Sequence, residues 1–248
     1  MKDIAKYEID GILFDLGSTL LEYETLPWNV LDVNCINSGY SFLRQSGYTV
    51  PPIDKFWANH VEIWQRYRER AFETLEEWCI IDAVKDLLGS FNINGNGRLP
   101  EQFFEAYYAP VSRQLSIFAD AHSVLQKLKT SGKRIGLVSN TYFPEEYHIE
   151  ELKRFGLFPY LNFTVFSVTF GYRKPHPSIY GKALELLETE PKKTLFVGDR
   201  YVEDCEGPRV AGMHTIIKYR TGKEYPELIK EGQIIVYSLT EMLEYIAD

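Results

Sequence analysis

Short apolar segments alternate with helical repeats over most of the chain. The apolar segments are rich in β-branched residues, which is typical of buried parallel strands. They cover residues 9–16, 134–139, 163–168, 194–198 and 215–218. Between them, apolar residues recur every three or four positions and predict amphipathic helices, as at Ala121, Val124, Leu125 and Leu128. A last apolar run at residues 233–239 predicts a further strand at the edge of the sheet. Strands that alternate with single helices predict an α/β fold, in which a Rossmann-like parallel sheet carries helices on both faces.

One long segment interrupts this pattern directly after its first strand. It has almost no strand signal, and its aromatic and aliphatic residues have helical spacing, as at Trp57, Val61, Trp64 and Ala71. An insertion at this point starts from the carboxyl end of the first strand, where open α/β sheets place their ligands. We therefore expect an all-helical cap that acts as a lid over the site.

The pattern predicts two domains with defined boundaries. Residues 1–21 and 119–248 would form the α/β core domain, and residues 22–118 would form the inserted cap domain.

Charge and composition exclude several classes of protein. The chain has 35 acidic and 27 basic residues, a formal net charge of -8, which argues against binding of nucleic acid through bulk positive charge. No apolar stretch approaches the roughly 18 residues of a membrane span. The three cysteines are far apart and form no metal-binding or redox pair. We expect a cytoplasmic protein, a monomer or homodimer, without nucleic-acid or membrane partners.

Residues that could carry chemistry stand where the predicted strands end. They are Asp15, Ser139, Lys174, Asp199 and Asp204. The carboxyl ends of parallel strands meet at one edge of a sheet, so the fold would bring these residues together. Clustered carboxylates raise one another's pKa unless a cation neutralises them. Carboxylate oxygens suit Mg²⁺, and the sequence therefore predicts a magnesium site.

Taken together and in this order, these segments resemble the motifs of the haloacid dehalogenase superfamily of hydrolases. The branch concerned has a helical cap inserted after the first strand. The matching segments read ILFDLGSTL, GLVSNT, GYRKP and FVGDRYVEDCEG. The resemblance implies a magnesium-dependent, phosphatase-like hydrolase that acts on a small phosphorylated or otherwise anionic metabolite.

The resemblance also implies a role for each matching residue. Asp15 would be the nucleophile, whose carboxylate attacks phosphorus and becomes an aspartyl phosphate. Ser139 and the amide groups around Asn140 would bind the phosphoryl oxygens. Lys174 would offset the negative charge that Asp15 and the phosphate bring together.

The implied magnesium site combines side chains with one backbone group. Asp15 and Asp199 would bind the cation directly, the backbone carbonyl of Gly17 would add a ligand, and Asp204 would lie nearby or act through water. The cation would then bridge the nucleophile and a phosphoryl oxygen, which reduces their repulsion.

Gly17 departs from the family pattern, which usually has a second aspartate two positions after the nucleophile. That carboxylate serves as general acid and base, and such a group is typically worth about 10² to 10⁴ in rate. We therefore expect slow hydrolysis of alkyl phosphate esters unless another side chain substitutes for it.

Three interpretations remain open. The first is a phosphatase that acts on good leaving groups, or that takes a replacement acid from the cap, for which Glu24, His60 and Glu62 are candidates. The second is a hydrolase of the haloacid dehalogenase or phosphonatase type, with Lys55 as a candidate Schiff-base lysine in the latter. The third is a catalytically silent ligand-binding or interaction protein that keeps the fold.

Overall fold

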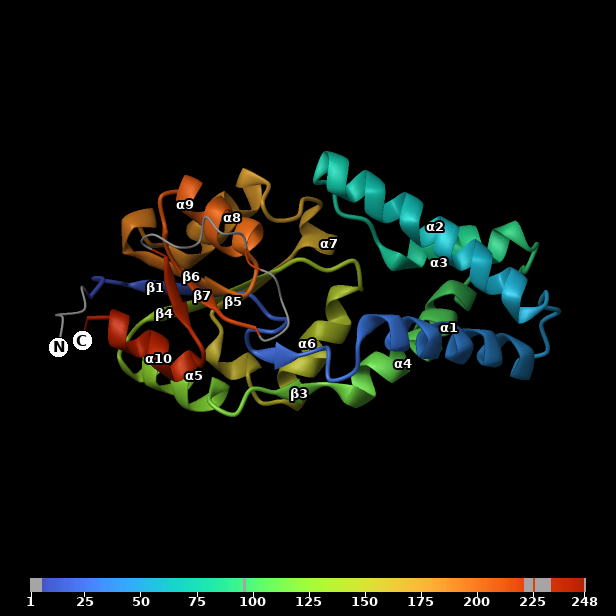
Figure 1. Cartoon of the computed structure of the whole chain (residues 1–248), viewed down its shortest axis with the longest axis horizontal. Coiled ribbons are helices and arrows are strands. Elements are labelled where there is room, and N and C mark those ends of the chain that lie inside the picture. The colour runs from blue at the N-terminus through green and yellow to red at the C-terminus, as the bar shows by residue number, and fades with distance from the viewer. Residues whose placement is uncertain (1–5, 96, 221–224, 226–232, 248) are drawn as a thin grey trace. The chain divides into compact units, whose positions relative to one another are not determined.

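The computed structural model describes residues 6–95, 97–220, 225 and 233–247 of the 248-residue chain. The chain divides into two compact units (Figure 1). The first, called the core unit, contains Met1–Glu22, Ile117–Thr141 and Glu145–Asp248. The second, called the helical unit, contains Tyr23–Ser116 and Tyr142–Pro144.

The core unit is built on a six-stranded sheet in which every pair of neighbouring strands is parallel. The strand order is β5-β4-β1-β6-β7-β8. These strands are β1 (Gly11–Phe14), β4 (Arg134–Ser139), β5 (Phe163–Phe166), β6 (Thr194–Gly198), β7 (His214–Lys218) and β8 (Ile234–Val236). The sheet confirms the predicted α/β class, including the late strand at its edge.

The order of the strands reverses around β1. The chain runs from β1 through β4 to β5 on one side, and then crosses back to β6, β7 and β8 on the other. Phe14, the last residue of β1, pairs with Leu137 of β4 and with Val197 of β6. Open α/β sheets bind ligands at the carboxyl ends of strands where the order reverses, so residues that end or follow these three strands occupy the favoured edge.

Helices cover both faces of this sheet (Figure 1). On one face, Ile179 and Ala183 of α8 belong to a buried cluster with Leu13 of β1 and Phe196 of β6. On the other face lie α5 and α10. The helices of the core unit are α5 (Ala121–Thr130), α6 (Glu145–Arg154), α7 (Ser167–Phe170), α8 (Pro177–Leu187), α9 (Gly207–Val210) and α10 (Leu239–Met242). Shorter helical turns are η1 (Phe158–Tyr160), η2 (Pro191–Lys193), η3 (Val202–Glu206) and η5 (Leu243–Tyr245).

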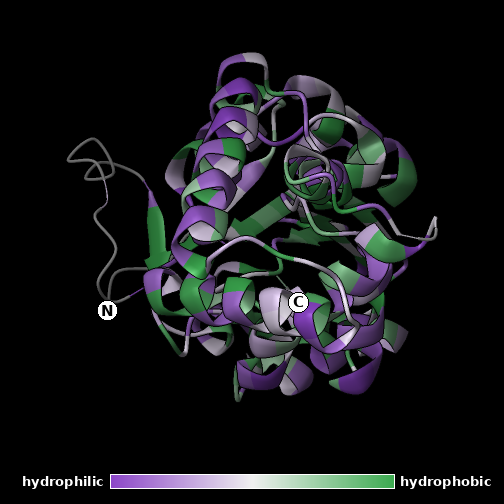
Figure 2. Ribbon diagram, turned by 90° about the vertical axis from the view of Figure 1, so that its right-hand side faces the viewer, coloured by the Kyte–Doolittle hydropathy of each residue, from purple (hydrophilic) through white to green (hydrophobic). Residues whose placement is uncertain are grey.

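Burial accounts for the sequence pattern of these elements. Figure 2 shows apolar strands in the sheet, whereas the helices alternate hydrophilic and apolar positions. In α5, Ala121, Val124, Leu125 and Leu128 are all buried, as their spacing predicts. Gly132, which follows that helix, has a φ of 75°, a conformation that glycine adopts without steric cost.

One predicted strand is shorter than its apolar run. The run extends over residues 163–168, but β5 ends at Phe166 and Ser167 begins α7. The hydroxyl of Ser167 accepts a hydrogen bond from the Thr141 backbone N–H (2.8 Å) and donates one to the Thr141 carbonyl (3.1 Å). These hydrogen bonds join Ser167 to the loop after β4, so the β-branched run does not continue as a strand.

The described part of the helical unit contains four long helices. They are α1 (Trp28–Gln45), α2 (Ile53–Thr74), α3 (Ile80–Ser90) and α4 (Leu99–Gln114). Trp64 and Ala71 of α2 are buried, as their spacing predicts, whereas Val61 is exposed. Within the described ranges, no helix has both the length and the apolar character needed to cross a bilayer.

A two-stranded sheet forms where the chain leaves the core unit and returns to it. β2 (Leu21–Glu22) pairs with β3 (Ser116–Ile117). The backbone N–H of Phe118 also donates to the carbonyl of Leu20 at 3.2 Å. The two ends of the inserted segment are therefore tied to each other through backbone hydrogen bonds.

Candidate active site

Three adjacent strands of the core sheet place polar side chains at one edge. Asp15 directly follows β1, Ser139 is the last residue of β4, and Asp199 directly follows β6. All three residues are buried. The backbone N–H of Asp15 donates to the carbonyl of Val197 at 2.9 Å, which extends the pairing of β1 with β6 by one residue. The sheet therefore fixes the position of Asp15.

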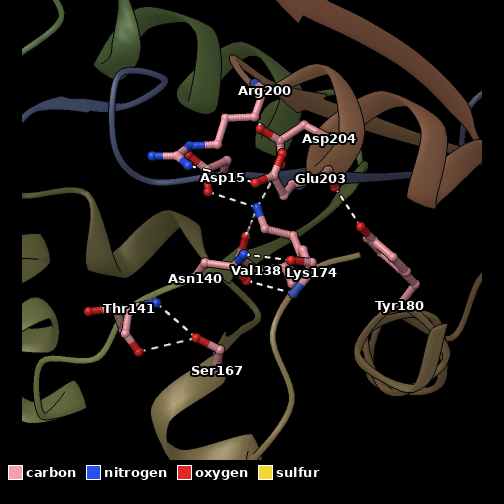
Figure 3. A network of polar contacts seen from close by, with 10 residues as sticks. All are labelled: Asp15, Val138, Asn140, Thr141, Ser167, Lys174, Tyr180, Arg200, Glu203 and Asp204. Atoms are coloured by element: carbon pink, nitrogen blue, oxygen red, sulfur yellow. Dashed lines mark hydrogen bonds and ion pairs between the residues drawn. The ribbon is translucent and has the colours of Figure 1, made fainter. Parts of the chain in front are cut away.

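Lys174 joins these elements through its ammonium group (Figure 3). Its Nζ donates to Asp204 Oδ1 at 2.7 Å, to Asp15 Oδ1 at 2.8 Å and to the carbonyl of Val138 at 2.9 Å. An ammonium group has three protons, and each of the three is donated here. The side chain is only 1% exposed. Lys174 is therefore a buried cation that holds two carboxylates in place.

The side chain of Asn140 holds the backbone of Lys174. Its Nδ2 donates to the Lys174 carbonyl at 2.8 Å, and its Oδ1 accepts from the Lys174 N–H at 2.7 Å. These two bonds join the loop after β4 to the loop before α8. The Asn140 side chain therefore positions Lys174, while its backbone amide stays a candidate for binding phosphoryl oxygens.

Asp204 lies in η3, a π-helical turn that follows β6 after three residues. π-Helical turns are rare and frequently occur at functional sites. Both carboxylate oxygens of Asp204 are engaged, Oδ1 by Lys174 and Oδ2 by the backbone N–H of Arg200 at 2.8 Å. The residue is completely buried, and it approaches the end of β6 so closely that a Cβ at Gly198 would lie 2.3 Å from Asp204 Cγ.

Gly198→Ala is expected to destabilise the fold by roughly 1–3 kcal/mol, because the new methyl group overlaps a carboxylate that is held on both oxygens. Gly181→Ala is the matched control, since Gly181 lies within α8 and has open space around the position of a Cβ. That variant should be neutral or more stable by up to about 1 kcal/mol. Urea unfolding measures both. Equal stability of the two variants would contradict the close packing of Asp204 against Gly198.

Burial and the charge of the opposite sign act in opposite directions on the pKa values of Asp15 and Lys174. Burial raises the pKa of Asp15 to about 7, against the favourable charge of Lys174 and with a further increase from Asp204 and Asp199. Burial lowers the pKa of Lys174, but Asp15 and Asp204 outweigh it and leave that pKa above its ordinary value. Lys174 therefore stays charged, while the negative charges of Asp15, Asp199 and Asp204 lie close together.

This crowding suits a divalent cation. Asp15, Asp199 and Asp204 each offer a carboxylate oxygen, and these atoms all lie within 4.8 Å of one another. A donor set made only of oxygen fits a hard cation such as Mg²⁺. Both oxygens of Asp204 already accept hydrogen bonds from the protein.

A family model of haloacid dehalogenase-like hydrolases matches residues 9–212, which is more than four-fifths of the chain. The chain belongs to this family. It is thus a member of a family of hydrolytic enzymes, and the resemblance seen in its motifs is confirmed.

The chain is 32% identical over 120 residues to the human haloacid dehalogenase-like hydrolase domain-containing protein 3. This match covers 48% of this chain and 45% of that protein. It is 30% identical over 118 residues to a glyceraldehyde 3-phosphate phosphatase of Methanopyrus kandleri, covering 48% and 49%. The matches thus span about half the length of these relatives. A crystal structure of 2-haloacid dehalogenase from Pseudomonas syringae superposes with a TM-score of 0.70 at 21% identity, over 96% of this chain and 97% of that one. This last likeness shows the shared fold.

Within this haloacid dehalogenase-like hydrolase, the structure gathers most of the residues singled out in the motifs. Asp15, Asp199, Asp204 and Lys174 form one buried cluster. Gly17, two residues after Asp15, forms a parallel bridge with Leu21.

Two groups around the site were not singled out in the sequence. The Val138 carbonyl that accepts from Lys174 is a backbone group, which any residue would provide. Lys218, the last residue of β7, is buried, and its Nζ donates to the carbonyl of Ser18 at 2.9 Å. Ser18 has a φ of 60°, a conformation that is uncommon for a residue with a side chain. A lysine at the end of an apolar strand was a signal that could have indicated the role of Lys218 in holding this loop.

His60, one candidate for a replacement acid, is a buried residue of the helical unit. Its ring lies 4.3 Å from the Trp64 ring and 5.4 Å from the Trp57 ring, measured between centroids. Burial lowers the pKa of His60 to about 3, with a further decrease from the charge of Arg68. The imidazole is therefore neutral at physiological pH and has no acidic proton to give.

Proposed function

We propose that this chain is a magnesium-dependent hydrolase of small phosphorylated metabolites, with Asp15 as its nucleophile. The observation that carries the proposal is the buried cluster in which Lys174 bonds to Asp15 and Asp204 while Asp199 lies beside them. Such a cluster places a nucleophilic carboxylate next to a fixed positive charge, as transfer of an anionic phosphoryl group requires. The phosphatase relative from Methanopyrus kandleri supports the same reaction class.

In the proposed first step, a carboxylate oxygen of Asp15 attacks the phosphorus atom, and the leaving group departs from phosphorus. The product is an aspartyl phosphate, which water then hydrolyses to restore Asp15. Ser139 and the backbone amides around Asn140 bind the phosphoryl oxygens. Lys174 offsets the added negative charge and keeps Asp15 in position through its 2.8 Å bond.

Asp15, Asp199 and the carbonyl of Gly17 are the proposed direct ligands of Mg²⁺, with Asp204 acting through water. When bound, this cation supplies positive charge that lowers repulsion between the carboxylates and the phosphoryl group. The chain has a net charge of -8, which makes such local neutralisation more important for an anionic substrate.

Removal of divalent cations is expected to abolish phosphate release from a panel of small phosphorylated metabolites. Activity measured as inorganic phosphate should fall to background in EDTA and return with added Mg²⁺. Asp199→Asn should raise the Mg²⁺ concentration for half-maximal activity by at least about tenfold, because it weakens a ligand. Asp10→Asn is the control, since Asp10 is an exposed carboxylate of the same unit that pairs with Lys193 at 3.2 Å.

Two results would contradict the proposal. Full phosphate release in EDTA would exclude the cation from the reaction. Halide release from 2-haloacids without metal, together with no phosphate release from any compound, would instead favour a dehalogenase.

A further inference from the structure

Among the described residues, the side chain that bonds to Asp15 is that of Lys174, and the groups joined by Lys174 have no proton free for a leaving group. Lys174 donates its three protons to Asp15, Val138 and Asp204. Asp204 accepts hydrogen bonds on both oxygens. Position 17, two residues after the nucleophile, is a glycine and has no side chain.

The imidazole of His148 does not fill this gap. Its Nε2 is bonded to the hydroxyl of Thr141 at 2.7 Å, and its Nδ1 is bonded to Glu151 at 3.0 Å. All three residues are buried. Both ring nitrogens of His148 are thus engaged in a structural network around the loop after β4.

A site without a proton donor favours some leaving groups over others. The alkoxide that leaves an alkyl phosphate is a strong base and needs a proton, and an enzyme without a positioned acid loses about 10² to 10⁴ in rate on such a substrate. A carboxylate needs no proton, because carboxylic acids have pKa values near 4. An acyl phosphate therefore suits this site better than an alkyl ester does.

Arg200 supplies a cation beside the nucleophile that the reaction steps above do not use. It directly follows Asp199, and the bond from its backbone N–H to Asp204 fixes its position. Its guanidinium interacts electrostatically with the negative charges of Glu203, Asp199 and Asp15, and Figure 3 shows it beside Asp15.

The guanidinium of Arg200 has donors to offer a ligand. Among the described residues its ion-pair partner is Glu203, whose Oε1 lies 3.7 Å from Nη1, which is longer than a hydrogen bond. The side chain is 56% exposed, so solutes can reach it. A guanidinium presents paired N–H donors that match the two oxygens of a carboxylate.

We infer that the site acts on acyl phosphates and that Arg200 binds the carboxylate that leaves. The inference rests on the proposed function. A carboxylate oxygen of Asp15 forms a bond to phosphorus while the bond between phosphorus and the acyl oxygen breaks. The electron pair of the broken bond stays on the departing carboxylate, so no proton moves in this step. Water then forms a bond to phosphorus, the bond to Asp15 breaks with its electron pair returning to Asp15, and the proton of water passes to solvent.

The test compares three substrates in the presence of Mg²⁺: acetyl phosphate, ethyl phosphate and p-nitrophenyl phosphate. We expect ethyl phosphate to react at least about 10³-fold more slowly than acetyl phosphate in kcat/KM, and Gly17→Asp to reduce this ratio by providing a carboxylic acid. Arg200→Met should lower kcat/KM for acetyl phosphate by roughly ten- to hundredfold. The same variant should lower the value for p-nitrophenyl phosphate by a factor at least about threefold smaller, because a nitrophenolate offers no carboxylate and only the interaction of Arg200 with the charges of the site is lost.

Arg209→Met is the matched control, since Arg209 is an exposed arginine of α9 in the same unit. It should leave all three rates unchanged. Equal losses on acetyl phosphate and p-nitrophenyl phosphate in Arg200→Met would overturn the role of Arg200, and comparable rates on ethyl and acetyl phosphate would overturn the substrate class. Either result leaves the proposed phosphatase intact. No Mg²⁺-dependent phosphate release from any compound would instead refute the proposed function itself.

Discussion

Replacing Asp15 by asparagine is expected to lower Mg²⁺-dependent phosphate release by about 10⁴-fold or more. The amide has nearly the same shape as the carboxylate but is a far weaker nucleophile, so the aspartyl phosphate does not form. Release of inorganic phosphate from acetyl phosphate and p-nitrophenyl phosphate measures the loss. Residual rates equal to those of the unchanged protein would show that another group carries the reaction.

The stability of the Asp15→Asn variant provides the control for folding. Burial raises the pKa of Asp15 to about 7 in the folded protein from an ordinary value of 3.8. Between these values the folded state binds the proton more strongly than the unfolded state does, so stability falls as the pH rises. In EDTA, the variant should match the unchanged protein at pH 4 and exceed it at pH 8 by up to about 4 kcal/mol. Urea unfolding at the two pH values measures this difference, and a less stable variant at pH 8 would contradict the crowding of charge around Asp15.

Lys174→Met is expected to destabilise the fold by about 3–5 kcal/mol and to abolish activity. The change removes three hydrogen bonds and leaves the Asp204 carboxylate buried without its cation. Chemical unfolding in EDTA measures the effect. Lys182→Met is the control, because Lys182 is a partly exposed lysine of α8 that pairs with Glu185, and it should change stability by less than about 0.5 kcal/mol.

A double variant separates loss of charge balance from loss of packing. Adding Asp204→Asn to Lys174→Met removes one of the buried charges, so the pair should be less destabilising than the sum of the single changes by about 1–3 kcal/mol. Strict additivity would show that the ammonium and the carboxylate do not depend on each other.

The core fold could be predicted because burial on both faces of a parallel sheet leaves a plain sequence pattern. The runs that contain β1, β4 and β6 are apolar and β-branched, and each stops at or near a polar residue that the sheet edge then gathers. The ends of the strands were less predictable, as the end of β5 shows. Residues 167 and 168 have strand character, yet the hydrogen bonds of Ser167 with Thr141 place them in a helix.

The acidic members of the site could be predicted, but their hydrogen bonds could not. Asp15, Asp199 and Asp204 stand next to recognisable motifs. The use of the Asn140 side chain to hold the backbone of Lys174 depends on how two distant loops meet, which spacing along the chain does not specify. The same is true of Arg200, whose place beside the carboxylates follows from the π-helical turn after β6.

The short pairing of β2 with β3 has an evolutionary consequence. Because both ends of the inserted segment are fastened side by side, the segment between them can lengthen, shorten or change its sequence at little cost in chain entropy to the sheet. The register of β1 with β4 involves no residue of that segment. Insertions and deletions between Glu22 and Ser116 are therefore compatible with an unchanged core sheet.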